Sequence, residues 1–248
     1  MGSSYVVTGG GRGIGRAIAA RLVADGAAVV VIDVAEPDPQ DGVTAVVGSA
    51  ADEVVCRRAA ERAEGLAPLA GWVNNAAVFD DVDLAADPAG VLRAVHDNLA
   101  PAVVGSAVAV RHLRDHGRPG AIVNVSSHQA QRAVRGALPY ATAKAAVEGL
   151  TRALAVDEGP HAIRVNAVAL GSITTERYER YLDGLPAEDR AGVEAQMAAL
   201  HPLGRIGRPE EVADVVAWLL GPTSGYVSGA VLPVDGGRAA QGRDPEEG

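Results

Sequence analysis

Short β-branched runs alternate with longer amphipathic stretches along this 248-residue sequence, and this alternation restricts the possible folds more than any other feature. The strand-like runs span residues 5–7, 28–32, 43–47, 71–73, 121–125, 163–167 and 230–234. The helical patterns between them include residues 15–25, 91–116, 140–158 and 209–220. Alternation of this kind predicts a parallel sheet with helices on both faces, and nearly continuous apolar strands are typical of a sheet buried on both sides. We therefore expect an α/β fold with a doubly wound parallel sheet.

The scarcity of aromatic residues supports the same fold class. Only 3% of the residues are aromatic, whereas 48% are hydrophobic, so the core must be built from Val, Leu, Ile and Ala. Such a core favours packed parallel strands and helices over an all-β architecture, whose sheets usually draw on aromatic side chains. No repeat or linker divides the chain, so we expect one Rossmann-type domain over residues 1–237. Within it, the charged helical segment 174–200 is interpreted as a substrate lid, and 238–248 as a polar tail.

Charge and cysteine content exclude several classes of function. The formal net charge is −9 and no basic patch is present, which argues against nucleic acid and anionic membranes as partners. Cys56 is the only cysteine, so no intrachain disulfide can form, in agreement with a reducing compartment. The N-terminal residues lack the pattern of an export signal, and no apolar stretch is as long as a membrane span. We expect a cytoplasmic protein, and we assign no metal site.

A glycine-rich turn follows the first predicted strand. Its sequence, TGGGRGIG over residues 8–15, leads directly into a predicted helix. Glycines at such a turn allow the backbone to approach a pyrophosphate, whose charge then lies at the helix N-terminus. The spacing departs from the strict GxGxxG pattern, so a tight turn without a ligand remains an alternative.

Asp33 at the end of the second predicted strand bears on the choice of cofactor. It lies at about the distance expected for an acidic residue that binds a ribose 2′-hydroxyl. A carboxylate there would repel a 2′-phosphate, so we expect NAD rather than NADP. Arg12 is the opposing feature, because a guanidinium in the turn could meet that phosphate. An ordinary polar residue at the end of a strand is the alternative interpretation of Asp33.

Tyr140 and Lys144 form the candidate catalytic pair. Residues four apart share one helix face, and an ammonium beside a phenol lowers the pKa of the phenol from about 10. Such a tyrosine can exchange a proton with an alcohol or a carbonyl near neutral pH. The preceding strand ends in Ser126 and Ser127, at the edge where parallel sheets bind ligands. A hydroxyl there could hold the substrate oxygen, although a turn or a helix cap is the ordinary interpretation of a Ser-Ser pair.

Together these features resemble the short-chain dehydrogenase/reductase family, and the resemblance extends from Tyr5 to about Gly237. The motifs stand in the family's order, which makes the set far more specific than any one of them. They are TGGGRGIG at 8–15, NNAA at 74–77, HDNL at 96–99, SS at 126–127, YATAK at 140–144, RVNAVALGSITT at 164–175 and VDGG at 234–237.

The resemblance implies a role for each matched residue. Tyr140 would be the general acid/base, Ser127 would polarise the reacting oxygen, and Lys144 would lower the pKa of the tyrosine and bind the nicotinamide ribose. Asn98 would bend its helix and support a water between Lys144 and solvent. The implied cofactor contacts are Gly9, Arg12, Gly13, Ile14, Gly15, Asp33, Ser49, Ala50, Asn75, Ala76, Ala77, Tyr140, Lys144, Gly171, Ile173 and Thr175. The family also implies a homotetramer formed through helices 91–116 and 140–158 and the C-terminal segment.

Four residues, at three places in the chain, depart from the family pattern. Ala77 replaces the last glycine of NNAG, a small change beside the central strand. Leu170 replaces the usual proline before Gly171, which leaves the loop that binds the carboxamide less rigid. Ser49 and Ala50 stand where Asp-Val is common beside the adenine, which removes one expected hydrogen bond. None of these changes affects the four catalytic positions.

The sequence says less about the substrate than about the cofactor and the catalytic residues. The stretch 128–135 is polar and basic, which suggests a polar or anionic substrate, with His128 and Gln129 as candidate contacts. Alternatively, Arg132 and Arg135 face solvent or another subunit, and His128 makes a structural hydrogen bond. We predict an NAD-dependent oxidoreductase that interconverts a small secondary alcohol and a ketone. An NADP-dependent 3-oxoacyl reductase and a non-catalytic dinucleotide-binding protein are the alternatives.

Overall fold

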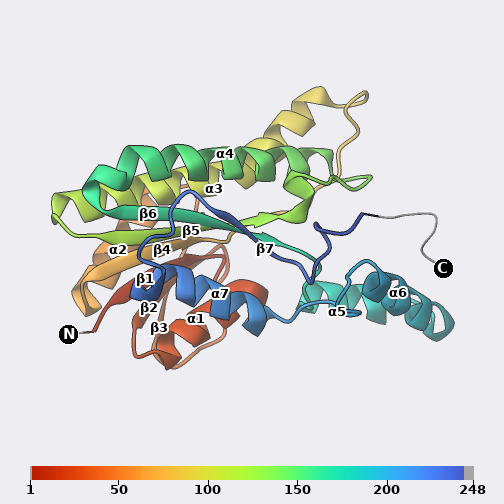
Figure 1. Ribbon diagram of the computed structural model, residues 1–248, viewed down its shortest axis with the longest axis horizontal. Coiled ribbons are helices and arrows are strands. Elements are labelled where there is room, and N and C mark those ends of the chain that lie inside the picture. The colour runs from red at the N-terminus through yellow and green to blue at the C-terminus, as the bar shows by residue number, and fades with distance from the viewer. Residues whose placement is uncertain (1, 243–248) are drawn as a thin grey trace.

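One parallel sheet forms the centre of the molecule in the computed structural model, which describes residues 2–242 (Figure 1). Its strands are β1 (Ser4–Thr8), β2 (Ala28–Asp33), β3 (Val43–Val47), β4 (Leu69–Asn74), β5 (Gly120–Ser127), β6 (Ile163–Leu170) and β7 (Val231–Val234). Their order is β3-β2-β1-β4-β5-β6-β7, and every neighbouring pair is parallel. The order reverses between β1 and β4, so the predicted doubly wound, single-domain fold is confirmed.

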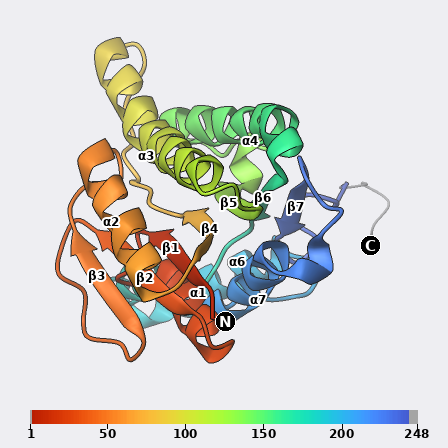
Figure 2. The same ribbon diagram turned by 90° about the vertical axis from the view of Figure 1, so that its left-hand side faces the viewer.

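Helices cover both faces of this sheet. They are α1 (Gly13–Ala24), α2 (Glu53–Leu66), α3 (Pro88–Asp115), α4 (Leu138–Glu158), α5 (Glu176–Asp183), α6 (Ala187–Ala199) and α7 (Pro209–Leu220), with short 3₁₀ turns η1 (His128–Ala130), η2 (Gly159–His161) and η3 (Pro222–Ser224). Figure 2 shows α1 and α7 on one face and α2, α3 and α4 on the other. None of the helices in the described part of the chain is long and apolar enough to cross a membrane.

The core lies in two apolar layers, one on each side of the sheet. Successive side chains of a strand point to opposite faces, so Val6 packs toward α2 and α3, whereas Val7 packs toward α1 and α7. Both are fully buried, as is Trp72 in the first layer. Strands buried on both faces account for the continuous apolar runs in the sequence.

The structure adds one helix that the sequence analysis did not predict. In α2 the buried positions are Cys56, Ala59, Ala60 and Ala63, a helical spacing filled with small side chains. Its N-terminus is capped by Asp52, whose Oδ1 accepts a hydrogen bond from the Val54 N–H at 2.8 Å. The strand expected over 163–167 extends to Leu170, because Ser126 and Ser127 of β5 pair with the last residues of β6.

The helical segment 174–200 folds as two helices. α5 ends at Asp183 and α6 begins at Ala187, with Gly184, Leu185 and Pro186 between them. Both helices lie at the end of the molecule where the strands terminate (Figure 1). Of the sequence assigned to a C-terminal tail, residues 238–242 are described, and 243–248 lie outside the described residues.

A carboxylate clamp joins several elements at the opposite end of the strands, where β4 and β5 begin. Glu64 accepts two hydrogen bonds from Arg118, at 2.9 and 2.7 Å, one from the Leu69 N–H at 3.0 Å and one from His112 Nε2 at 3.0 Å. The Arg118 guanidinium is the main reason that the pKa of Glu64 falls well below its usual value. The clamp ties α2 and α3 to the starts of β4 and β5.

Candidate active site

The glycine turn lies at the point where the strand order reverses, which in open α/β sheets is where ligands bind. Thr8 Oγ1 accepts hydrogen bonds from the N–H groups of Asn75 and Ala76, at 2.9 and 3.0 Å. In return, Asn75 Nδ2 donates to the carbonyl oxygens of Thr8 and Gly9, at 3.1 and 3.0 Å. This reciprocal Thr8–Asn75 lock fixes the turn after β1 against the end of β4.

The turn has the conformation of a pyrophosphate cradle. Gly9 and Gly13 adopt φ values of +62° and +53°, and any Cβ on Gly15 would clash with the Gly9 carbonyl oxygen. Arg12 is exposed, and its side chain makes no capping hydrogen bond to α1, while Ile14 is half-buried. The Gly13 N–H already donates to a carboxylate oxygen, Glu176 Oε1, at 3.2 Å. An anion therefore fits at the start of α1, which agrees with the preference of helix N-termini for negative charge.

Asp33 terminates β2 beside this turn. Its Oδ2 accepts a hydrogen bond from the Gly11 N–H at 2.9 Å, and its Oδ1 accepts one from the Val34 N–H at 2.8 Å. The carboxylate is thus held in place, and each oxygen keeps acceptor capacity for a further donor. Ser49 is exposed and its hydroxyl accepts the Ala51 N–H at 3.2 Å, whereas Ala50 is buried.

Tyr140 and Lys144 lie in the first turns of α4, as predicted. Lys144 Nζ is 5.4 Å from the centroid of the Tyr140 ring and donates to the Val125 carbonyl oxygen at 2.8 Å. Only 3% of Lys144 is exposed, and this burial lowers the pKa of its ammonium from 10.5 to about 8. The ring of Phe79 stacks on Tyr140 with 4.7 Å between centroids. No pattern in the sequence pointed to Phe79, which lies in the loop after β4.

Ser127 and Asn98 are both buried close to this part of the fold. Ser127 is the last residue of β5, and its Oγ accepts a hydrogen bond from the Gln129 N–H at 3.2 Å. Asn98 Oδ1 accepts from the Val78 N–H and Asn98 Nδ2 donates to the Ala94 carbonyl oxygen, both at 3.0 Å. Asn98 therefore holds the loop after β4, where Ala77 is exposed, against α3. α3 continues through this position to Asp115.

The segment after β6 is held by backbone hydrogen bonds although Leu170 stands in place of a proline. The Gly171 N–H donates to the Val234 carbonyl oxygen at 3.0 Å, and a Cβ on Gly171 would lie 2.8 Å from the Cα of Asp235. Ile173 pairs with Gly207 in an isolated bridge. Thr175 caps α5, since its Oγ1 accepts a hydrogen bond from the Tyr178 N–H at 3.4 Å.

His128 lies in a small pocket next to Ser127. His128 is 7% exposed; its Nδ1 donates to the Leu170 carbonyl oxygen at 3.2 Å, and burial, aided by the charge of Arg238, lowers its pKa. Among the described residues, His128 Nε2 and the buried Oε1 of Gln129 have no hydrogen-bond partner. The pocket has a volume of about 160 Å³ and is lined by His128, Arg132, Leu200, Arg238 and Gln241.

Besides Phe79, four residues at the site were not assigned a role by the sequence analysis. Thr8 and Glu176 contact the glycine turn, as described above. The other two hold Ser172: its N–H donates to His201 Nε2 at 3.2 Å, and its Oγ accepts from Arg238 Nη1 at 2.9 Å. These contacts join residues far apart in the chain, so no local sequence pattern predicts them.

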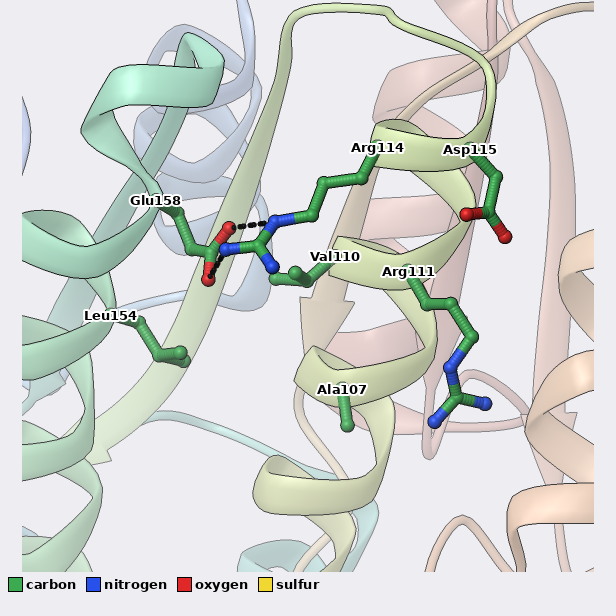
Figure 3. A pocket seen from close by; sticks show the side chains of 7 residues that line it. All are labelled: Ala107, Val110, Arg111, Arg114, Asp115, Leu154 and Glu158. Atoms are coloured by element: carbon green, nitrogen blue, oxygen red, sulfur yellow. Dashed lines mark hydrogen bonds and ion pairs between the residues drawn. The ribbon is translucent and has the colours of Figure 1, made fainter.

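A larger groove, of about 440 Å³, lies between α3 and α4 and is separate from this site (Figure 3). Arg114 bridges it by donating two hydrogen bonds to Glu158, at 2.8 and 2.7 Å. Its residues on α4, Leu154 and Glu158, are 14 and 18 positions beyond Tyr140, which places them roughly 20 Å or more along the helix axis. The groove is a feature of the outer helical surface.

Comparisons with known proteins agree with this geometry. Residues 9–239 match the protein family described as enoyl-(acyl carrier protein) reductase. The short-chain reductase protein NovJ of Streptomyces niveus is 38% identical over 95% of this chain and 94% of its own length. The 2,5-dichloro-2,5-cyclohexadiene-1,4-diol dehydrogenase of Sphingobium indicum is 34% identical over 96% of this chain and 98% of its own. The ligand-free aldohexose dehydrogenase of Thermoplasma acidophilum superposes with a TM-score of 0.90 at 28% identity, covering 99% of this chain and 98% of that one.

Proposed function

We propose that this chain, which belongs to the short-chain dehydrogenase/reductase family and is an oxidoreductase acting on CH–OH groups, uses NAD to interconvert a secondary alcohol and a ketone. The observation that carries the proposal is the buried Lys144 ammonium beside the ring of Tyr140. A bound nicotinamide dinucleotide supplies the hydride acceptor or donor for this reaction.

The proton steps belong to Tyr140. In alcohol oxidation its Oη takes the proton of the substrate hydroxyl, and in ketone reduction it returns that proton to the substrate oxygen. The positive charge of Lys144 favours the phenolate form, because little water is present to screen it. Ser127 Oγ holds and polarises the same substrate oxygen. Asn98 holds the loop after β4 against α3. In that position it supports a water molecule that connects Lys144 with solvent.

The residues at the reversal of strand order fit a dinucleotide. The glycine turn, with Gly9, Arg12, Gly13, Ile14 and Gly15, would hold the pyrophosphate, and Asp33 the adenosine ribose. The remaining contacts would be Ser49, Ala50, Asn75, Ala76 and Ala77 on the adenine side, Tyr140 and Lys144 at the nicotinamide ribose, and Gly171, Ile173 and Thr175 at the carboxamide. The constrained Asp33 carboxylate supports NAD, since a 2′-phosphate beside it would be repelled.

The test is turnover of a panel of secondary alcohols and ketones, followed by nicotinamide absorbance with both cofactors. Tyr140→Phe should abolish turnover and leave NAD affinity within about threefold, because it removes only the ionisable hydroxyl. Activity that survived this change would refute the proton-transfer role. Tighter binding of NADP than of NAD would instead favour the NADP-dependent 3-oxoacyl reductase, and NAD binding without any turnover would favour a non-catalytic member of the family.

We also propose that the protein is a cytoplasmic homotetramer assembled through α3, α4 and the C-terminal segment. Apolar side chains exposed on these elements support this: Val103 is 43% exposed, Val156 is 77% exposed, and Tyr226 is fully exposed. Exposed apolar side chains of this kind are often covered at an interface between copies. Light scattering at micromolar concentration should give four times the monomer mass, and a monomeric mass would refute the assembly.

A further inference from the structure

We propose that the pocket lined by His128, Arg132 and Arg238 binds the carboxylate and a hydroxyl group of the substrate, so that the enzyme acts on small hydroxylated carboxylic acids and their oxo forms. This inference rests on the proposed dehydrogenase function and assigns its substrate class.

The pocket presents two guanidinium groups that no carboxylate among the described residues neutralises. Within residues 2–242, neither Arg132 nor Arg238 forms an ion pair with a carboxylate. Asp235 is the acidic group that attracts Arg238 electrostatically. Its two carboxylate oxygens, however, accept hydrogen bonds from the N–H groups of Gly237 and Ala239, at 3.0 and 2.7 Å. Arg238 uses one nitrogen on Ser172 and keeps its other donors. Two guanidinium groups with free donors match the planar geometry of a carboxylate.

His128 requires a different partner from the arginines. Because its Nδ1 donates to the Leu170 carbonyl oxygen, Nε2 of the neutral ring carries a lone pair and can only accept. This atom is buried and has no donor among the described residues, which is costly to maintain in a folded protein. A substrate hydroxyl would supply the missing donor. The pocket is therefore suited to bind a molecule that carries both an anionic group and a hydroxyl group.

The position of the pocket connects it with the reaction. His128 directly follows Ser127, and Arg238 donates to Ser172 in the segment assigned to the nicotinamide carboxamide. Leu200, at the end of the lid segment, provides an apolar wall. One small molecule could thus place its reacting carbon at Ser127 and Tyr140 and its carboxylate between the two arginines.

The experiment compares short acids with two or more hydroxyl groups, from glycerate to gluconate, with the corresponding uncharged amides in NAD-dependent oxidation. The wild-type protein should prefer the acids in kcat/KM. Arg132→Gln should reduce the acid-to-amide ratio of kcat/KM by about 10- to 100-fold, the effect expected when a hydrogen bond between charged groups is lost. Arg135→Gln is the matched control: this arginine is exposed three positions further along and does not line the pocket, so the ratio should stay within about twofold.

Two further measurements keep the subsite separate from the catalytic proposal. Calorimetric titration of the acids and the amides onto the NADH-bound protein reports binding even where no turnover occurs. His128→Phe should weaken the binding of both, because both carry the hydroxyl group assigned to His128, whereas Arg132→Gln should weaken the binding of the acids alone. Turnover of amides or simple alcohols with no preference for acids, or an acid-to-amide ratio unchanged by Arg132→Gln, would overturn the subsite and leave the dehydrogenase function standing. Absence of turnover on every alcohol would refute the proposed function, whereas acids that failed to bind in the titration would overturn the subsite.

Discussion

Replacing Lys144 by methionine should make the protein more stable while abolishing its activity. Burial lowers the pKa of this ammonium from 10.5 to about 8, which corresponds to a destabilisation of ~3 kcal/mol near neutral pH. Methionine has a similar length and no charge, so it removes this cost. It also removes the hydrogen bond from Nζ to the Val125 carbonyl oxygen, a loss of ~1–3 kcal/mol. We therefore expect a net gain of about 1 kcal/mol in unfolding free energy near pH 7.

The pH dependence of this difference is the sharper test. Below the folded-state pKa, both the folded and the unfolded protein hold the Lys144 proton, and the full cost is present. Between about pH 8 and 10.5 the unfolded chain binds more protons than the folded one, so wild-type stability rises with pH relative to the variant. From about pH 7 to about pH 9.5, the advantage of Lys144→Met should shrink by ~2 kcal/mol, or about 4–8 °C in Tm.

Two assays can measure these quantities. Thermal melts of both proteins without cofactor, at several pH values, give the stability difference. Lys144 is the only lysine among the 248 residues, so labelling with [¹⁵Nζ]lysine gives one side-chain NMR signal whose titration reports the pKa directly. Tyr140→Phe serves as the control background, because it leaves the lysine as the only titrating member of the pair. A titration midpoint near 10.5, or a Tm difference that does not vary with pH, would refute the reasoning.

Three other substitutions test separate parts of the structure. Asp33→Ala should raise the ratio of NADP to NAD affinity at least about tenfold in fluorescence titrations, because it removes the charge that repels a 2′-phosphate; an unchanged ratio would contradict this role. Glu176→Gln should tighten NAD binding about two- to fivefold, since a carboxylate that competes for the Gly13 N–H is weakened. Glu179→Gln on the same helix is its control, and weaker NAD binding in Glu176→Gln would count against the competition. Glu64→Gln should lower Tm by about 4–8 °C, a loss of ~2 kcal/mol from the Arg118 contact, with kcat/KM unchanged; a Tm within about 1 °C of wild type would show that the clamp contributes little.

The sequence predicted those parts of the fold in which hydrophobicity differs strongly between neighbouring segments. The strands of the central sheet stand out because long Val and Ile runs lie between polar segments. α2 was missed because its buried face consists of Cys56 and three alanines, which differ little in hydrophobicity from their exposed neighbours. The lid was treated as one segment because its charges are continuous, although Gly184 and Pro186 are ordinary breakers between helices.

The candidate site divides in the same way. The glycine turn and the Tyr140–Lys144 pair lie in short motifs, so their positions could be read along the chain. The contact of Glu176 with Gly13 and that of Arg238 with Ser172 depend on how distant segments come together. The burial of His128, which supports the proposed subsite, depends on that same arrangement, and a sequence pattern shows only that the surrounding stretch is basic.

The Thr8–Asn75 lock has a consequence for redesign of this protein. The lock uses two side chains and otherwise main-chain atoms. Thr8 ends β1 and Asn75 directly follows β4, so neither belongs to segment 174–200 or to the stretch 128–135. Segment 174–200 or the stretch 128–135 can therefore be exchanged while the cradle of the turn is kept intact. Within segment 174–200, Glu176 accepts a hydrogen bond from the Gly13 N–H and Thr175 also lies beside Gly13, so an exchange of either residue would also affect the turn.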